Sequence, residues 1–269
     1  AERMGAIARE LSASETAFLT PDAADDVDRR IRYFTPTEEV DLCGHATIAS
    51  LAFLHGEGVL DAGTGRLRTN AGVVDVEVTD DGVAWMETGE PSVDPVELDY
   101  DRAGEAFGID PAAMRDVGSD LPAAVATVGL PFLIVPVNFL EHLGNADPDM
   151  DAVAALAADH GATGVYAFTF DALDAASTLH ARMWAPGAGV PEDPVTGTAS
   201  GACGAYLRTV DAFDDLPAEM RFEQGHFVDR PGVVRVQVDG AIRVGGRAVT
   251  ALDGSLAVPP ADEDDILEA

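Results

Sequence analysis

The chain has 269 residues, with 48 acidic side chains against 16 basic ones and a net charge of −32 at pH 7. Because no basic stripe exists to meet phosphate groups, this composition argues against nucleic-acid binding. Apolar residues make up 47% of the chain, enough for a full core. No apolar run approaches the roughly 20 residues that a membrane-spanning helix needs, so no membrane partner is expected.

The acidic residues are spread along the chain, and every basic residue is an arginine. A self-repelling surface loses compactness unless salt screens it, which favours adaptation to high intracellular salt. The alternative, an acidic surface that binds a partner, would more often be clustered. Cys43 and Cys203 show neither a disulfide framework nor zinc spacing, and residues 1–7 read as a helix rather than a signal peptide. We therefore expect a cytoplasmic protein.

The first half of the chain mixes helical and extended patterns. Met4, Ile7 and Leu11 recur at helical spacing and predict a surface helix over 2–12. An entirely apolar stretch, 46–54, predicts a second helix that is buried on all sides. The other elements expected here are strands at 16–20, 30–34, 66–69, 73–79 and 83–88, with a hairpin turn at 80–82, and short helices at 101–107 and 111–117.

The second half repeats this plan. It is expected to contain an amphipathic helix from Met150, a second buried helix at 198–207, and strands at 132–137, 165–170, 178–184, 220–223, 233–238, 242–244 and 256–258. Helices followed by strands, twice, predict an α+β fold of two curled, mostly antiparallel sheets, each around one central helix. The expected divisions are an N-terminal half at 1–122, which can also receive the C-terminal strand, a C-terminal half at 123–258 and an acidic tail at 259–269.

The two buried helices suggest two similar halves with a cleft between them. Free backbone N–H groups and the positive end of each helix dipole would face this cleft and hold an anionic ligand. Gly44 stands at the start of the first helix, and Gly197 and Thr198 stand at the start of the second. Two ordinary core helices with capped ends remain the alternative explanation.

Three polar side chains near these helix starts could do chemistry. Glu15 lies at a junction between helix and strand, where partial burial would raise its pKa toward a value useful for acid/base catalysis; a solvated glutamate is the alternative. His45 could bind a substrate through its ring, or bond a backbone carbonyl. Asp193, just before Pro194, could orient a substrate or His45, or serve as a turn acid. Cys43 could be a reactive thiol or a small buried hydrophobe.

Six short blocks carry a resemblance: Ser14-Glu-Thr-Ala-Phe18, Phe34-Thr-Pro-Thr-Glu-Glu-Val40, Cys43-Gly-His-Ala-Thr47, Glu192-Asp-Pro-Val-Thr-Gly-Thr-Ala199, Gln224-Gly225 and Arg230-Pro231. Their order and spacing, over residues 3–258, resemble the PhzF-like family of phenazine biosynthesis proteins. Each block alone is weak, but the combination is specific. The resemblance implies the diaminopimelate-epimerase fold, with two barrel-like halves, a central helix in each and the active site between them.

The resemblance also implies proton transfer by a glutamate without a cofactor or a metal. In the phenazine enzyme itself this is a double-bond isomerisation of a cyclohexadiene carboxylate. The glutamate falls on Glu15, the neighbouring histidine on His45, and the aspartate of the Asp-Pro-x-Thr-Gly motif on Asp193. The usual serine is Thr198 here, whose methyl group would narrow the pocket. The implied partners are a small carboxylate substrate and a second copy in a homodimer.

Two departures from related patterns matter. The resemblance implies that the first strand of the N-terminal half and part of the pocket wall are lacking. Epimerases of this fold use one thiol at each helix mouth; Cys43 occupies the first position, but Pro194 occupies the second and Cys203 lies further down the helix. A two-thiol racemase is therefore disfavoured. We expect a PhzF-like isomerase, with an epimerase or racemase that uses Cys43, or an inactive metabolite-binding relative, as alternatives.

Overall fold

The computed structural model describes residues 1–22, 27–115, 117 and 121–257. Its helices are α1 (Glu2–Leu11), α2 (Gly44–Gly56), α3 (Tyr100–Phe107), α4 (Ala112–Arg115), α5 (Leu140–Gly144), α6 (Met150–Asp159) and α7 (Gly197–Thr209), with the 3-10 turns η1 (Pro186–Ala188) and η2 (His226–Val228). Its strands are β1 (Thr16–Thr20), β2 (Arg29–Phe34), β3 (Glu39–Val40), β4 (Gly63–Arg68), β5 (Val73–Val78), β6 (Ala84–Glu87), β7 (Ser92–Pro95), β8 (Ala124–Thr127), β9 (Pro131–Pro136), β10 (Gly164–Thr169), β11 (Leu179–Ala185), β12 (Val190–Asp193), β13 (Met220–Gln224), β14 (Gly232–Gln237) and β15 (Arg243–Gly246).

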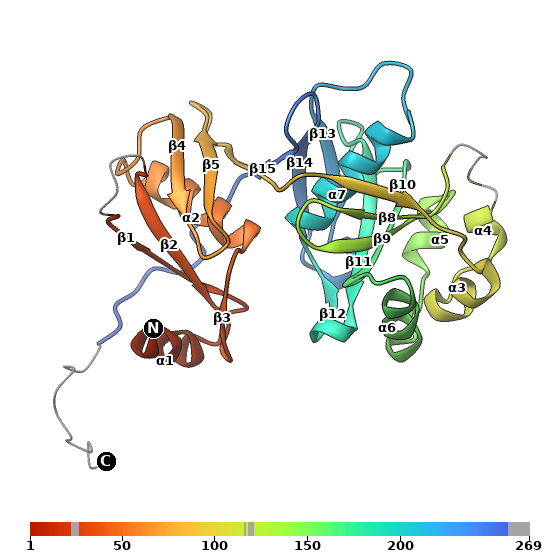
Figure 1. Ribbon diagram of the computed structural model, residues 1–269, viewed down its shortest axis with the longest axis horizontal. Coiled ribbons are helices and arrows are strands. Elements are labelled where there is room, and N and C mark those ends of the chain that lie inside the picture. Colours follow the sequence, from red (N-terminus) through yellow and green to blue (C-terminus); the bar gives the residue numbers. More distant parts are fainter. Residues whose placement is uncertain (23–26, 116, 118–120, 258–269) are drawn as a thin grey trace, which may run out of the picture.

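The strands join into one mixed sheet that curls around α2 at one end and α7 at the other. Its order is β1-β2-β4-β5-β6-β15-β14-β13-β11-β10-β9-β8-β7, with β3 beside β2 and β12 beside β11. Neighbours run antiparallel except in the parallel pairs β2–β4, β9–β10 and β11–β13. Figure 1 shows the two groups side by side, joined through β15, which pairs with both β6 and β14. The predicted α+β class is confirmed.

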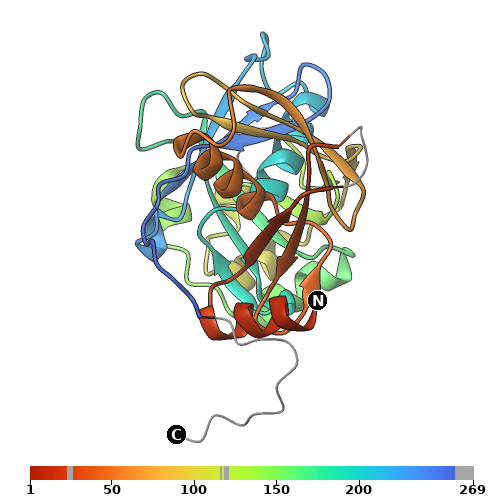
Figure 2. The same ribbon diagram turned by 90° about the vertical axis from the view of Figure 1, so that its left-hand side faces the viewer.

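Apolar packing links the two groups and covers the far face of the second. One core cluster includes Leu51 of α2, Tyr206 of α7 and the strands between them. A second cluster packs α3 and α6 on the opposite face of the sheet, around Phe107, Leu156 and Trp184. Figure 2 shows α1 lying across one end of β1 and β2 and the segment after β15 running along the same group. None of the helices that the structure describes combines the length and hydrophobicity that a bilayer crossing needs.

Most predicted elements are present, with shifts of a few residues at their ends. The strands β3, β7, β8 and β12 and the helix α5 were not predicted. Residues 124–127 are small and alternate only weakly, so the sequence reading assigned them to a junction. The prediction of a strand at 256–258 is wrong for residues 256 and 257, which are not in a strand. Residue 258 and the expected acidic tail at 259–269 lie outside the described residues.

The expectation that both central helices are buried on all sides is correct for α7 and wrong for α2. Every residue of α7 from Ala199 to Leu207 is buried. In α2 only Ala46, Thr47 and Leu51 are buried, and Phe53 is 48% exposed. An apolar composition indicates that a helix face can be buried, but it does not determine which segments cover that face. In the described chain the sheet packs against only one side of α2.

The change from one group to the other falls earlier than the predicted division at residue 122. β7 pairs with β8, and α3 packs against α6, so residues 92–115 lie with the C-terminal group. Strand β15 returns to pair with β6 of the N-terminal group. The sequence places the boundary near 121–129, where no flexible linker marks it, whereas the change follows the short Gly- and Pro-containing segment 88–91. The division into separate domains stays a prediction.

Tight packing of α7 gives a first testable prediction, at Gly204. A Cβ atom at this position would lie 2.5 Å from Val236 Cγ1 and 3.1 Å from Val238 Cγ1. We expect Gly204→Ala to lower the free energy of unfolding by about 1–3 kcal/mol through overpacking, less the gain of about 1 kcal/mol in helix propensity. Gly56→Ala in α2, where no atom lies within 4 Å, is the control and should cause no loss. Urea unfolding of both variants measures the difference, and equal midpoints would contradict it.

Candidate active site

Glu15 and His45 are brought together at the start of α2. Glu15 lies just before β1, His45 is the second residue of α2, and His45 Nε2 lies 3.0 Å from Glu15 Oε2. The Glu15 side chain is 22% exposed and the His45 side chain is 47% exposed. The pair therefore sits at the edge of the core, where a ligand can reach it and solvent screens it only in part.

The charges of this pair differ from those expected from the sequence. The hydrogen-bonding contact with His45 holds the pKa of Glu15 below its usual value and outweighs the opposing effect of burial. Contacts with Cys43 and then with Glu15 raise the pKa of His45 to about 10. The expectation of a glutamate with a raised pKa is therefore corrected. At neutral pH the resting pair is a carboxylate beside an imidazolium, because each charge stabilises the other.

Cys43 completes a small cluster at this helix start. Its Sγ atom lies 3.6 Å from Nδ1 and 3.7 Å from Nε2 of His45. The ligand-type atoms of Glu15, Cys43 and His45 all lie within 4.8 Å of one another, so this trio has the composition of a metal-binding group. Cys203 is fully buried, and burial raises the pKa of its thiol. Cys203 is therefore not placed to act as a second thiol base.

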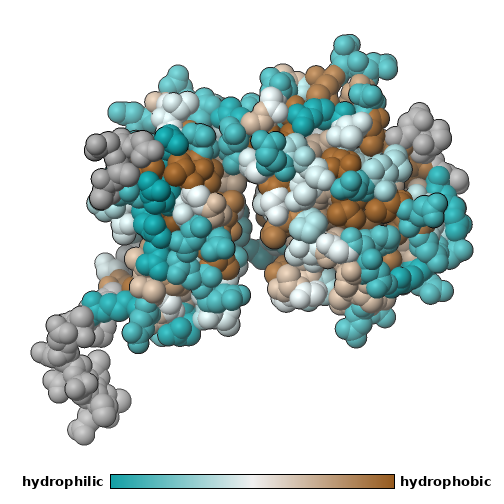
Figure 3. All heavy atoms as spheres, in the orientation of Figure 1, coloured by the Kyte–Doolittle hydropathy of each residue, from teal (hydrophilic) through white to brown (hydrophobic). Residues whose placement is uncertain are grey.

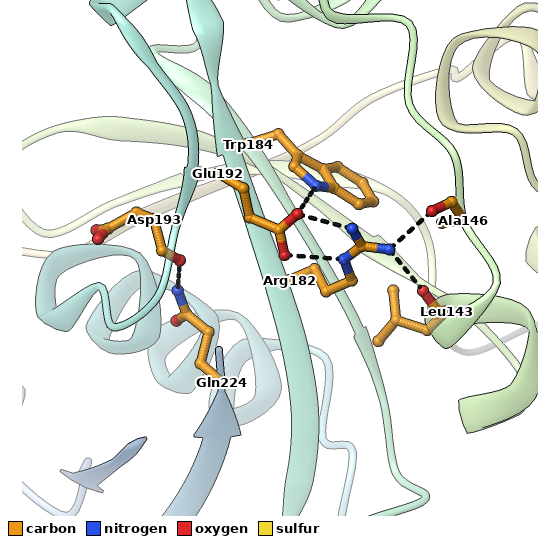
Figure 4. A network of polar contacts seen from close by, with 7 residues as sticks. All are labelled: Leu143, Ala146, Arg182, Trp184, Glu192, Asp193 and Gln224. Atoms are coloured by element: carbon orange, nitrogen blue, oxygen red, sulfur yellow. Dashed lines mark hydrogen bonds and ion pairs between the residues drawn. The ribbon is translucent and has the colours of Figure 1, made fainter. Parts of the chain in front are cut away.

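Asp193 ends β12 and is held by its neighbours in the loop before α7. Thr196 Oγ1 donates to Asp193 Oδ2 at 2.6 Å. The side-chain amide of Gln224 donates to the main-chain oxygen of Asp193 (Figure 4). The same amide donates to Thr196 Oγ1, and its oxygen accepts from the Thr196 N–H. Burial has the largest effect on the pKa of Asp193 and raises it, and the charges of His45 and Glu15 have smaller effects of opposite sign.

A buried ion pair anchors the strand that carries Asp193. Arg182 donates through Nε and Nη2 to the two carboxylate oxygens of Glu192 at 2.9 and 2.7 Å, and through Nη1 to the main-chain oxygens of Leu143 and Ala146. Trp184 Nε1 donates to Glu192 at 3.1 Å, and Figure 4 shows all these contacts together. The sequence reading missed this network. Its available signals were a lone arginine within an apolar strand and a second acid directly before Asp193.

The starts of both central helices line one pocket of about 250 Å³. Gly44 and His45 of α2 and Gly197 of α7 form one part of its wall. The remaining lining residues are Ile48, Ala49, Val195, Val233, Val234, Val244, Gly245, Gly246, Arg247 and Ala248. The lining does not include Glu15, Asp193 or Thr198. Figure 3 shows an open groove between the two groups on one face of the molecule.

Neither central helix is capped by a side chain at its start. The N-cap residues are Cys43 for α2 and Thr196 for α7, and neither side chain accepts a hydrogen bond from the first turn. The first intrahelical N–H donors are those of Thr47 and Ser200. The helix-start residues that line the pocket, Gly44, His45 and Gly197, precede these donors, and free N–H groups at a helix start are the arrangement that binds carboxylates and phosphates.

The Glu15–His45 pair leads to a prediction about pH. Because the pKa of His45 is raised from 6.5 to about 10, its stabilising contribution is complete below pH 6.5 and is lost as the pH rises through about 10. The contribution of Glu15 is present above its ordinary pKa of 4.5 and is lost as the pH falls through the lowered value. Solvent screening limits the total to about 1 kcal/mol or less. Nitrogen-15 NMR of the ring should show His45 protonated at pH 8, and a midpoint near 6.5 would contradict the pair.

The fold, with Glu15 and His45 in contact at a helix start, is also found in solved structures of the isomerase and epimerase type. A similar solved structure is the Bacillus anthracis phenazine biosynthesis protein of the PhzF family, with a TM-score of 0.79, 28% identity, and coverage of 91% of this chain and 85% of that one. A probable proline racemase from Agrobacterium radiobacter K84 is similar in fold, with a TM-score of 0.61, 14% identity, and coverage of 92% of this chain and 77% of that one. The fold is therefore diaminopimelate-epimerase-like, as the sequence predicted.

The chain belongs to the PhzC-PhzF family of phenazine biosynthesis-like proteins, whose family model matches residues 1–254. Among curated relatives, the uncharacterized isomerase YfhB of Bacillus subtilis (strain 168) is 33% identical over 259 residues, covering 94% of this chain and 85% of the relative. These findings confirm the predicted family and support an isomerase-type activity.

Proposed function

We propose that this protein is an isomerase that moves a proton between two carbon atoms of a small carboxylate, with Glu15 as the general acid/base. The observation that carries the proposal is the 3.0 Å contact between Glu15 and His45 at the uncapped start of α2. A carboxylate with a lowered pKa is ionised at neutral pH, which is the form that accepts a proton; because a lowered pKa also makes it a weaker base, the substrate C–H group must be an acidic one. The imidazolium beside it can stabilise negative charge that develops on the substrate.

The reaction conserves atoms and electrons without a cofactor. The Glu15 carboxylate removes a proton from an acidic C–H group, the electron pair shifts along a conjugated system, and protonated Glu15 returns the proton to another carbon. His45 and Asp193 position the substrate and tune Glu15 through their charges. The N–H groups near Gly44 and Gly197, with the Thr198 hydroxyl, hold the substrate carboxylate.

The test is solvent isotope exchange with a panel of small unsaturated and cyclic carboxylic acids. The full chain is incubated with each acid in deuterium oxide, and proton NMR follows deuterium incorporation and bond migration. We expect at least one acid to gain deuterium at carbon and to yield a double-bond isomer, and Glu15→Gln to abolish both. Binding of an acid without any exchange would favour the inactive, metabolite-binding alternative.

A second candidate, an epimerase that uses Cys43, is favoured by one contact, the 3.6 Å approach of Cys43 Sγ to His45. In that case an exchanging substrate would invert a stereocentre and would not shift a double bond. Cys43→Ser should then abolish exchange, whereas the isomerase proposal expects Cys43→Ser to retain it. The two variants Glu15→Gln and Cys43→Ser together discriminate the two candidates.

We further propose that this protein works as a homodimer in a salt-rich cytoplasm. With a net charge of −32, repulsion between surface carboxylates opposes folding until salt screens it. The screening length falls from about 10 Å at 0.1 M salt to about 3 Å at 1 M. We therefore expect the thermal unfolding midpoint to rise steadily with potassium chloride over this range, and a flat response would contradict the adaptation. Light scattering tests the dimer.

A further inference from the structure

A second group of chemistry-bearing side chains lies in the C-terminal group of strands, apart from the proposed active site. His180 on β11 and Glu223 on β13 are paired in the register of two parallel neighbouring strands, and His226 follows in η2. His180 Nε2 lies 3.1 Å from His226 Nδ1, and the ligand-type atoms of all three side chains lie within 4.8 Å of one another. His180 is 0% exposed, Glu223 is 2% exposed and His226 is half-buried.

The buried carboxylate in this group has no cation of its own. Its two oxygens accept hydrogen bonds from the N–H groups of Leu173 and Asp174, at 2.8 and 2.7 Å. Within the described residues no arginine forms an ion pair with Glu223, and the charge of nearby Arg182 is already matched by Glu192. Buried charges in proteins are normally paired with an opposite charge or bound to a metal ion. Among the described residues, the carboxylate of Glu223 has neither partner.

The buried imidazole is also incompletely satisfied. His180 Nδ1 is buried and has no hydrogen-bond partner in the described chain. The other ring nitrogen, Nε2, lies 3.1 Å from His226 Nδ1, so the two rings face each other through these nitrogens. Neutral imidazole is the form that binds metal ions.

We propose that His180, Glu223 and His226 bind one divalent transition-metal ion of the zinc class. Two histidines and one glutamate form an established zinc-binding set, with a water molecule as the fourth ligand. Tetrahedral zinc with bonds of about 2.0–2.1 Å places its ligand atoms about 3.3 Å apart, close to the 3.1 Å between His180 Nε2 and His226 Nδ1, so Nε2 would be the ligand atom of His180 and Nδ1 would carry its proton. The half-buried His226 leaves a side from which the ion can enter. The two backbone bonds to Glu223 would orient it as a ligand.

This ion would brace the segment that supports Asp193. Glu223 and His226 flank Gln224, whose amide holds Asp193 and Thr196. Between them Gly225 has a φ of +82°, and a Cβ atom there would lie 2.6 Å from the main-chain oxygen of Pro194. The site is therefore structural, and it does not depend on the proposed isomerase activity.

Metal binding to the full chain tests this proposal directly. The purified protein is stripped with a chelator and titrated with zinc by calorimetry and with cobalt by visible absorption, which reports tetrahedral coordination. We expect one equivalent of zinc at this site and its loss in His226→Ala and Glu223→Gln, with affinity reduced by more than about 100-fold, since even partners outside the ligand set are worth about 10–100-fold. His160→Ala, a half-buried histidine at the end of α6, is the matched control.

The cluster of Glu15, Cys43 and His45 could also bind metal, so His45→Ala is measured in parallel. The proposal requires that His45→Ala and His160→Ala keep the equivalent that His226→Ala loses. Zinc should also raise the unfolding midpoint of the wild-type protein but not that of His226→Ala. Circular dichroism of the metal-free proteins checks folding. If Glu223→Gln does not fold, the zinc titration of His226→Ala alone tests the site. Absence of zinc binding in the wild type, or binding that only His45→Ala removes, would overturn the proposal.

Discussion

Glu15→Gln is expected to reduce the rate of proton exchange at substrate carbon by about 100- to 10,000-fold, the usual contribution of a general acid/base group. Glutamine has nearly the same shape and keeps a contact with His45, but it cannot accept a proton from carbon. The loss should appear in kcat, with KM little changed, because the N–H groups that hold the carboxylate remain in place. Deuterium incorporation, measured with the substrate found in the panel, is the readout.

The matched control for this variant is Glu10→Gln, an exposed glutamate in the last turn of α1. It removes the same charge from the same short region and should leave exchange unchanged. Glu15→Gln should unfold at nearly the same temperature as the wild type, because the ion pair with His45 is worth about 1 kcal/mol or less. Exchange at the wild-type rate in Glu15→Gln would remove Glu15 from the reaction and would favour Cys43 as the base.

Local patterns in the sequence were sufficient to predict the fold class and the two central helices. The starts of α2 and α7 fall at Gly44 and Gly197, where a glycine follows a polar loop and precedes an apolar run. Patterns of this kind depend only on neighbouring residues. They could not predict that Phe53 on α2 is exposed, because burial depends on segments that are distant in sequence. The strand β8 was missed for a related reason, since its small residues are explained only by the strands beside them.

The structure brings two of the predicted site residues, Glu15 and His45, into contact, but the sequence did not indicate the direction of the pKa shift of Glu15, and the catalytic roles stay predictions. His45 and Asp193 were selected by their positions near helix starts, Glu15 by its place between a helix and a strand, and all three by the resemblance of the surrounding blocks. The structure pairs Glu15 with His45 at 3.0 Å, and this contact reverses the expected pKa shift of the glutamate. The reversal depends on the distance between two side chains from distant segments, which the sequence does not determine. No rule of sequence spacing would have predicted the ion pair between Arg182 and Glu192.

That ion pair leads to the largest stability effect that we expect. The Arg182 and Glu192 side chains are 8% and 9% exposed, and their contact is bidentate. Glu192→Gln would leave the guanidinium buried without a counter-charge, which typically costs about 3–5 kcal/mol. Because Glu192 directly precedes Asp193, exchange activity should fall as well. Urea unfolding measures the first effect, and deuterium incorporation measures the second.

The control for this prediction is an exposed pair of the same chemistry. Asp101→Asn breaks the contact of Asp101 with Arg115, whose side chains are 75% and 47% exposed, and should cost about 1 kcal/mol or less. The double variant Arg182→Met/Glu192→Leu removes both buried charges and should recover part of the loss. Recovery should be incomplete, since Arg182 also donates to the main-chain oxygens of Leu143 and Ala146, which no other donor would then satisfy. A loss in Glu192→Gln no larger than that in Asp101→Asn would mean that water reaches the pair, and Asp193 would then need another anchor.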